Sequence, residues 1–114
     1  MKIEAYSFGC MKIDGVEYRS DVIVFPDKVR SGWWRQEGHS LSVADLGEVI
    51  EFGPEVLIVG TGASGIMDVP ALTVDALQKK GIEVAAANTG QAWHLFNEYI
   101  RQGKKAVGAF HLTC

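Results

Sequence analysis

Residues 56–65 read Val56-Leu57-Ile58-Val59-Gly60-Thr61-Gly62-Ala63-Ser64-Gly65, an apolar run that leads directly into three spaced glycines. A short run of aliphatic residues is typical of a strand buried on both faces of a sheet. The glycines repeat as Gly-x-Gly-x-x-Gly, the pattern that lets a backbone approach the pyrophosphate of a dinucleotide. The stretch therefore predicts a buried strand and a tight turn at its carboxyl end.

The residues around this turn do not fit a dinucleotide site. A nucleotide-binding helix would begin at the glycines, but Pro70 falls in its second turn, where proline costs about 3 kcal/mol or more. The next strand ends in Ala85-Ala86-Ala87-Asn88, without the acidic residue that binds the ribose hydroxyl. No Gly-Lys-Ser/Thr sequence follows, so a Walker phosphate loop is excluded as well. We therefore interpret Gly60, Gly62 and Gly65 as residues that shape a loop across strand ends.

Beyond the turn, helical and strand patterns alternate. We predict a helix over Thr73–Lys80 capped by Thr73, a strand over Ile82–Ala87, a helix over Thr89–Gln102 and a strand over Lys105–Leu112. The long helix carries one apolar stripe, formed by Ala92, Leu95, Phe96, Tyr99 and Ile100. Strands that alternate with helices imply parallel strands joined by right-handed crossovers.

The first half of the chain is rich in strands and turns. Lys12–Tyr18 contains the Asp-Gly pair of a tight hairpin turn, and Asp21–Phe25 is a strand that stops at Pro26. A further short strand is expected over Arg30–Arg35, carrying Trp33 and Trp34.

A short helix is predicted over Ser42–Leu46. Ser42 is the cap, Asp45 is its capping-box partner, and Gly47 limits the length. Together these elements predict an α/β fold with a mixed central sheet, in which a C-terminal β-α-β-α-β parallel unit follows an N-terminal β-hairpin subdomain. We expect a single domain over residues 1–114.

Composition narrows the class of protein. The chain has 114 residues, of which 47% are hydrophobic and 22% charged, as in globular proteins. Residues 1–55 hold ten acidic and six basic residues, and residues 56–114 hold four acidic and five basic ones. Neither half has the positive field that nucleic-acid binding requires. The apolar runs are far shorter than the roughly 20 residues of a membrane span, and no signal peptide is recognisable. We expect a cytoplasmic protein that binds neither nucleic acid nor membrane.

The residue types that bind metals or react with substrates are sparse. Cys10 and Cys114 lack the close spacing of a redox pair, so we expect two free thiols. His39, His94 and His111 show no metal-ligand spacing. We expect a hydrogen-bonded structural role for His39, solvent exposure for His94, and a surface or packing role for His111 on an end strand. No cofactor, metal or catalytic residue is predicted.

A crevice is expected where two turns meet at the carboxyl ends of adjacent parallel strands. In Asn88-Thr89-Gly90-Gln91, free N–H groups at a helix start can bind a carboxylate or phosphate, but a simple helix cap at Asn88 or Thr89 is the more common arrangement. The candidate ligand-binding residues are Gly60, Thr61, Gly62, Ser64, Asn88, Thr89 and Asn97.

Three segments resemble a known family. Trp34–Leu41 followed by Asp45-Leu46 is similar to its tryptophan–histidine segment, and Leu57–Gly62 to its central strand and glycine turn. Gly81–Val84, Asn88-Thr89 and Phe96-Asn97 are similar to the family's last strand–helix crossover. The family is a small domain of unknown function in archaeal and bacterial hypothetical proteins. Its relatives include the vertebrate adipogenesis-associated domain protein and a mitochondrial complex I assembly factor. The chain most resembles a short single-domain prokaryotic member.

The resemblance implies a mixed sheet with helices and a β-hairpin subdomain, and it implies no established activity or cofactor. The positions that match the family's recurrent residues are Trp34, His39, Asp45, Gly60, Gly62, Thr89 and Asn97. The chain departs from many relatives near Ala85, where they carry an acidic residue, and at Ala92-Trp93-His94, where they carry Ala-Cys-Arg.

Two functions follow from the residues and the resemblance. The first is a non-catalytic binding or assembly-type module with a small polar crevice at the strand ends. Its protein partner would contact Trp33, Trp34 and Trp93, because tryptophan is enriched at interaction hot spots. The alternative is a binder of a small anionic metabolite, or an enzyme acting on one, through the Gly60–Gly65 and Thr89 turns.

Overall fold

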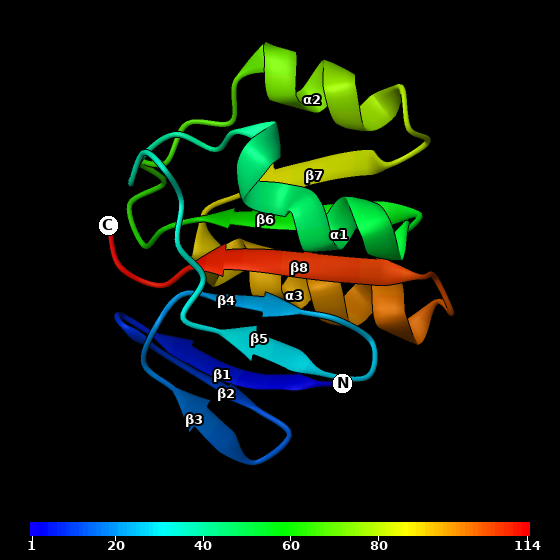
Figure 1. Cartoon of the computed structure of the whole chain (residues 1–114). Helices are drawn as coiled ribbons and strands as arrows, with labels where there is room; N and C mark the ends of the chain where they lie inside the picture. Colours follow the sequence, from blue (N-terminus) through cyan, green and yellow to red (C-terminus); the bar gives the residue numbers. More distant parts are fainter.

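The computed structural model describes all residues from Met1 to Cys114. Two sheets are present (Figure 1). The smaller is antiparallel, in the order β1-β2-β3, with bounds Ile3–Ser7, Cys10–Ile13 and Val16–Tyr18. The larger has the order β5-β4-β8-β6-β7, with bounds Val29–Ser31, Val22–Val24, Ala106–His111, Val56–Thr61 and Glu83–Ala87. The mixed α/β architecture predicted from the sequence is confirmed.

The C-terminal half is the predicted parallel unit. Strand β6 pairs in parallel with β7 on one side and with β8 on the other. Helix α2, Ala71–Gln78, joins β6 to β7, and helix α3, Thr89–Arg101, joins β7 to β8. Strands β4 and β5 extend this sheet in antiparallel pairing, which makes it mixed.

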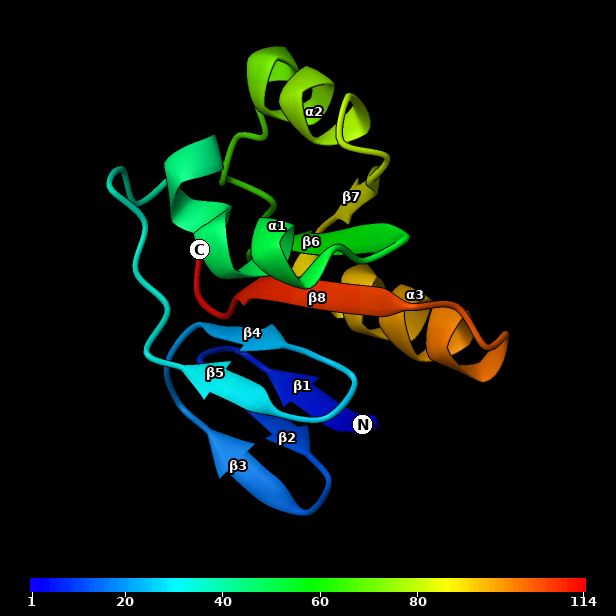
Figure 2. The ribbon, with the colours of Figure 1, turned by 45° about the vertical axis from the view of Figure 1, so that its right-hand side comes forward.

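Alternating side chains build one core on each face of the five-stranded sheet. Leu57, Val59, Val107 and Ala109 pack toward the 3₁₀-helix η1, Val43–Leu46, and helix α1, Gly47–Phe52. Val56, Ile58, Ala106 and Phe110 pack toward α3 and the three-stranded sheet. Figure 2 shows α1 and α2 on one side of the sheet and α3 on the other. None of these helices has the length and hydropathy that a membrane span requires.

The N-terminal hairpin has the expected turn. Asp14 and Gly15 both have positive φ, 49° and 82°, between β2 and β3. Two positive φ values suit the two-residue hairpin loop that matches strand twist, and Asp-Gly is a preferred pair there.

Several local predictions need correction. The strand expected over Arg30–Arg35 is Val29–Ser31, and Trp33 and Trp34 lie beyond it. Gly47 does not end the helix after Ser42, because the chain continues from η1 into α1.

Helix α2 begins directly after Pro70, which occupies its N-cap, and not at Thr73. Proline is tolerated there because the first N–H groups of a helix have no intrahelical partner. Leu95, predicted in the apolar stripe of α3, is 38% exposed.

Gly108 provides a test of packing between β8 and α3. A Cβ placed on it would lie 2.6 Å from Phe110 Cζ and 3.0 Å from Phe96 Cδ1. Gly108→Ala is therefore expected to lower the free energy of unfolding by about 1–3 kcal/mol through overpacking. Chemical denaturation measures the change. The matched control is Gly47→Ala, since nothing lies within 4 Å of a Cβ at Gly47. Equal effects of the two substitutions would contradict the packing described.

Candidate functional site

One edge of the five-stranded sheet collects polar side chains from distant parts of the chain. Strand β8 ends at His111 beside the start of β4, because Val22 pairs with Phe110. Asp21 directly precedes β4, and the segment that leaves β5 carries Arg35 along the same edge (Figure 1). Antiparallel pairing thus brings residues 21, 35 and 111 together at the carboxyl ends of the parallel strands.

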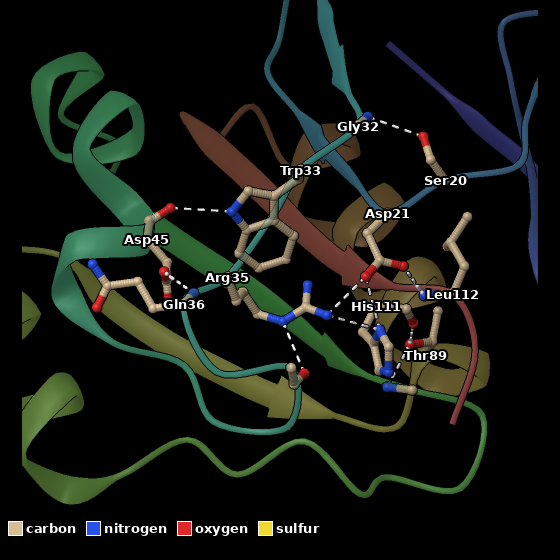
Figure 3. Close-up of polar contacts among 12 residues, drawn as sticks. Ser20, Asp21, Gly32, Trp33, Arg35, Gln36, Asp45, Thr89, His111 and Leu112 are labelled. Carbon is tan, nitrogen blue, oxygen red and sulfur yellow. Dashed lines mark hydrogen bonds and ion pairs between the residues drawn. The ribbon is translucent and has the colours of Figure 1, made fainter.

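Asp21, Arg35 and His111 form a buried cluster (Figure 3). Asp21 Oδ2 lies 2.8 Å from Arg35 Nη2 and 2.8 Å from His111 Nδ1, and its Oδ1 accepts the Leu112 N–H at 2.7 Å. The side chains of Arg35 and His111 are only 5% and 8% exposed. Because an ionised carboxylate only accepts hydrogen bonds, we assign the Nδ1 proton of His111 to the contact with Asp21.

The charge on Asp21 is stabilised by these partners. Burial alone would raise the pKa of Asp21, but hydrogen bonds from the Leu112 N–H, His111 and Arg35 outweigh it and hold the pKa below its usual value. The Asp21 carboxylate is therefore ionised at neutral pH and is the counter-ion of Arg35.

Two polar atoms of the cluster have no hydrogen-bond partner within the protein. They are Arg35 Nη1 and His111 Nε2, and both are buried. Arg35 Nε donates to Gly38 O at 3.1 Å, and its guanidinium lies over the Trp33 ring, 4.8 Å from the centroid. Buried charged groups are normally fully paired, so an unpartnered guanidinium nitrogen marks this cluster as a candidate site.

A pocket of about 470 Å³ opens beside the cluster. It is lined by Ser20, Asp21, Gly32, Trp33, Trp34, Arg35, Gln36 and Gly38. We call it the Trp34 pocket, because the Trp34 side chain on its rim is 86% exposed. The volume lies within the range of small-molecule sites.

Asp45 and His39, which match the family's tryptophan–histidine segment, lie next to the pocket and the buried cluster without lining the pocket. Asp45 accepts the N–H groups of Ser42 and Gln36, at 2.9 and 3.0 Å, and its carbonyl accepts the Trp33 indole N–H at 3.1 Å. His39 is exposed, and its ring meets the His111 ring edge to face at 5.9 Å. Of Trp34, His39 and Asp45, only Trp34 lines the pocket, while Asp45 holds the pocket residues Trp33 and Gln36 and His39 contacts the cluster at His111.

The glycine turn and the start of α3 contact each other directly. Thr89 is fully buried; its Oγ1 donates to His111 O at 2.6 Å and accepts the Gly62 N–H at 2.9 Å. The Thr89 N–H donates to Gly62 O at 3.0 Å. A Cβ on Gly60 would lie 2.8 Å from Thr89 Oγ1, so that glycine permits the close approach. The polar groups of Thr89 are thus bonded within the protein, and ligand binding between these turns stays a prediction.

Gly62 faces the end of the chain. A Cβ there would collide with the Cys114 backbone, and φ is +105°. The Ala63 N–H donates to Thr113 O at 2.7 Å. Residues 113 and 114 therefore pack against the loop that the sequence pattern singles out.

The remaining candidate residues are placed separately. Thr61 Oγ1 donates to Ala87 O at 3.1 Å, and Ser64 is exposed on the loop. Asn88 caps α3, its side chain accepting the Gln91 N–H at 3.0 Å. Asn97 lies further along α3, where its Oδ1 accepts the Ile3 N–H at 3.0 Å and its Nδ2 donates to Ile3 O at 2.7 Å. None of Thr61, Ser64, Asn88 and Asn97 lines the Trp34 pocket.

The prediction for His111 is partly wrong. Strand β8 is the central strand of the sheet, and His111 lies buried in the polar cluster instead of on an end strand. Sequence reasoning also missed Asp21 and assigned Arg35 no site. The available signal was a histidine at the carboxyl end of an otherwise apolar strand. His94 is exposed, and both cysteines are free, as predicted.

Comparisons with known proteins agree with this architecture. The family described as "Protein of unknown function (DUF498/DUF598)" matches residues 3–111. The conserved hypothetical protein PH1505 from Pyrococcus horikoshii OT3 is 27% identical, with a TM-score of 0.82, over 100% of both chains. Rpa2829 from Rhodopseudomonas palustris is 26% identical, with a TM-score of 0.78, over 95% of this chain and 80% of that one.

The fold is also found in a protein from Bordetella pertussis that is described as a Mth938-like domain. That protein is 21% identical, with a TM-score of 0.79, over 97% of this chain and 85% of its own. The family resemblance seen in the sequence is therefore confirmed. The chain belongs to the DUF498/DUF598 family of proteins of unknown function.

Proposed function

We propose that this domain is a non-catalytic binding module whose binding site is the Trp34 pocket. The observation that carries the proposal is an exposed tryptophan on the rim of a pocket that is lined by a buried arginine with an unpartnered nitrogen. An apolar wall with a few convergent polar groups is the usual composition of a ligand site.

The chemistry of the cluster favours binding over catalysis. Asp21 and His111 are arranged like an acid–base pair, but His111 does not line the Trp34 pocket, so its Nε2 is not placed to accept a proton from a nucleophile bound there. The hydroxyl of Ser20 lies in the pocket wall and accepts the Gly32 N–H at 2.9 Å, away from His111. The Asp21 carboxylate pairs with Arg35 and His111 and holds the guanidinium in place, which supports a binding role for Arg35.

The same pocket suits an assembly role. Trp and Arg are the residues most enriched at hot spots of protein interfaces, and both are present here. A small molecule and a side chain of a partner protein would use the same contacts: the Trp34 ring and the Arg35 guanidinium.

A fragment screen by NMR tests the proposed function. The ¹⁵N-labelled chain is titrated with a set of small acids, amides, alcohols and heterocycles. We expect hits that shift the Trp34 indole and Arg35 Nε resonances without being chemically changed. Hits that all map to other surfaces, or turnover of a bound compound, would contradict the proposal.

Trp34→Ala is expected to weaken binding of such a hit at least about tenfold, because truncating a hot-spot residue costs about 2 kcal/mol or more. The free energy of unfolding should change by no more than about 0.5 kcal/mol, since Trp34 is a surface residue. The matched control is Leu72→Ala, whose side chain is 81% exposed on α2 and lies outside the pocket. If calorimetry gives the same affinity of the hit for Trp34→Ala and Leu72→Ala, Trp34 is not part of the binding site.

A further inference from the structure

Some N–H groups of the Arg35 guanidinium have hydrogen-bond acceptors within the protein, and those of Nη1 have none. A guanidinium carries five N–H groups in a fixed fork. Nε donates to Gly38 O at 3.1 Å, and Nη2 lies 2.8 Å from Asp21 Oδ2 and 3.1 Å from His111 Nδ1. Nη1 has no partner, and Figure 3 shows it pointing toward the space between Trp33 and Asp21. The two N–H groups of Nη1 are thus left for an acceptor from outside the cluster.

The polar groups next to Arg35 already form hydrogen bonds with other partners. Asp21 Oδ1 accepts the Leu112 N–H, and Oδ2 accepts from Arg35 and His111. The Trp33 indole N–H donates to Asp45 O, which leaves only the ring face toward the guanidinium. The acceptor that suits a charged fork best is a carboxylate, because charge-assisted hydrogen bonds are shorter and stronger than neutral ones.

The rest of the pocket indicates what the carboxylate is attached to. Trp34 supplies flat apolar surface at the rim, where it is 86% exposed, whereas Trp33 is 8% exposed and lies against the Arg35 guanidinium. Nothing lies within 4 Å of a Cβ placed on Gly32 or Gly38, so the walls next to the rings are open. A planar apolar body can stack on Trp34 while its acidic group reaches the guanidinium.

We infer that the Trp34 pocket binds a carboxylate carried on a small planar apolar group, an inference that rests on the proposed function. The same chemistry occurs in free aromatic acids and at the C-terminus of a polypeptide that ends in an aromatic residue. In both, one carboxylate oxygen accepts from Arg35 Nη1, and the ring packs on Trp34.

Two matched pairs of probes test the inference on the full chain. Benzoate and benzamide represent a free acid and its neutral counterpart. N-acetyl-phenylalanine and its C-terminal amide represent a polypeptide end. Calorimetry gives the affinities, and the Trp34 indole and Arg35 Nε resonances report the place of binding.

We expect the acid of at least one pair to bind at least about tenfold more tightly than its amide, as a charge-assisted contact requires. Discrimination in the benzoate pair alone assigns a free acid, and discrimination in the phenylalanine pair alone assigns a polypeptide end. Trp34→Ala should weaken the preferred acid about tenfold or more. Arg35→Lys, which keeps the charge but loses the fork, should reduce the preference for acid over amide.

Three results would overturn the inference. If the acid and the amide bind equally in both pairs, the pocket does not recognise a carboxylate, although the proposed function still stands. Acids that bind without moving the Trp34 and Arg35 resonances would place them outside the pocket. If none of the four probes binds, aromatic carboxylates are excluded as ligands of the pocket. The NMR fragment screen described above then tests the proposed function separately. If Arg35→Lys does not fold, the Trp34→Ala comparison carries the test, because that residue is exposed.

Discussion

Asp21→Ala is expected to lower the free energy of unfolding by about 3–5 kcal/mol, the usual cost of removing one partner of a buried ion pair. The substitution leaves the Arg35 guanidinium, 5% exposed, without its counter-ion, and leaves the Leu112 N–H without its acceptor. Urea denaturation followed by tryptophan fluorescence measures the change, since Trp33 lies against Arg35.

Two further variants show whether the loss of stability is specific to this buried, paired carboxylate. Glu17→Ala breaks the exposed pair with Arg19 and should change stability by less than about 1 kcal/mol. Asp21→Ala combined with Arg35→Met should recover part of the loss, because no uncompensated charge is then buried. A cost for Asp21→Ala as small as that for Glu17→Ala would contradict the buried cluster.

The same pair gives a pH dependence with a definite sign. The pKa of Asp21 is lower in the folded protein than in the unfolded chain, so its stabilising contribution is fully present above the unfolded value of about 3.9. That contribution is lost as the pH falls through the folded pKa. Wild type should therefore lose more stability on acidification below about pH 4 than Asp21→Ala does, and parallel pH profiles would contradict the assignment.

Thr89→Val is expected to lower the free energy of unfolding by about 2–4 kcal/mol. The two side chains have nearly the same shape, but valine leaves the Gly62 N–H and the His111 carbonyl without the Thr89 hydroxyl. Each buried group that loses its partner costs about 1–3 kcal/mol. The effect should also reach the polar cluster, because His111 belongs to it, and a shift of the His111 ring resonances would report this.

Thr73→Val is the matched control for this prediction. Thr73 is also buried, but its hydroxyl makes a single hydrogen bond, to Leu41 O at 2.8 Å. A loss of about 1 kcal/mol is expected, clearly less than for Thr89→Val. If both variants lost the same stability, the hydrogen bonds between the glycine turn and α3 would not have the weight described here.

Much of the fold was predictable because its signals are local. The apolar run 56–59, the amphipathic pattern of 89–101 and the Asp14-Gly15 turn each specify an element within a few residues. Pro70 excluded a helix at the glycines, and the structure starts α2 directly after it. The bounds of α2 shifted because the helix begins after Pro70 without a side-chain cap, while the Thr73 hydroxyl donates to Leu41 O instead of capping the helix.

The Trp34 pocket was only half predictable. The tryptophan–histidine segment drew attention to Trp34, His39 and Asp45 through family resemblance. Asp21 and His111 are separated by 90 residues in the sequence, and they meet only because β4 pairs with β8. Such a contact leaves no periodic signal in a single sequence. The sequence pattern instead emphasised the glycine turn, whose glycines allow Thr89 and the last residues to pack closely.

The decisive measurement is a crystal structure of the full chain with the acid, benzoate or N-acetyl-phenylalanine, that binds more tightly, at a resolution that resolves individual atoms of the ligand. Our interpretation predicts a carboxylate oxygen about 3 Å from Arg35 Nη1, with the aromatic ring packed on Trp34 and the Asp21–Arg35 pair intact. A structure in which Nη1 pairs with an acceptor of this chain, and Trp34 closes the pocket with no ligand inside, would contradict it.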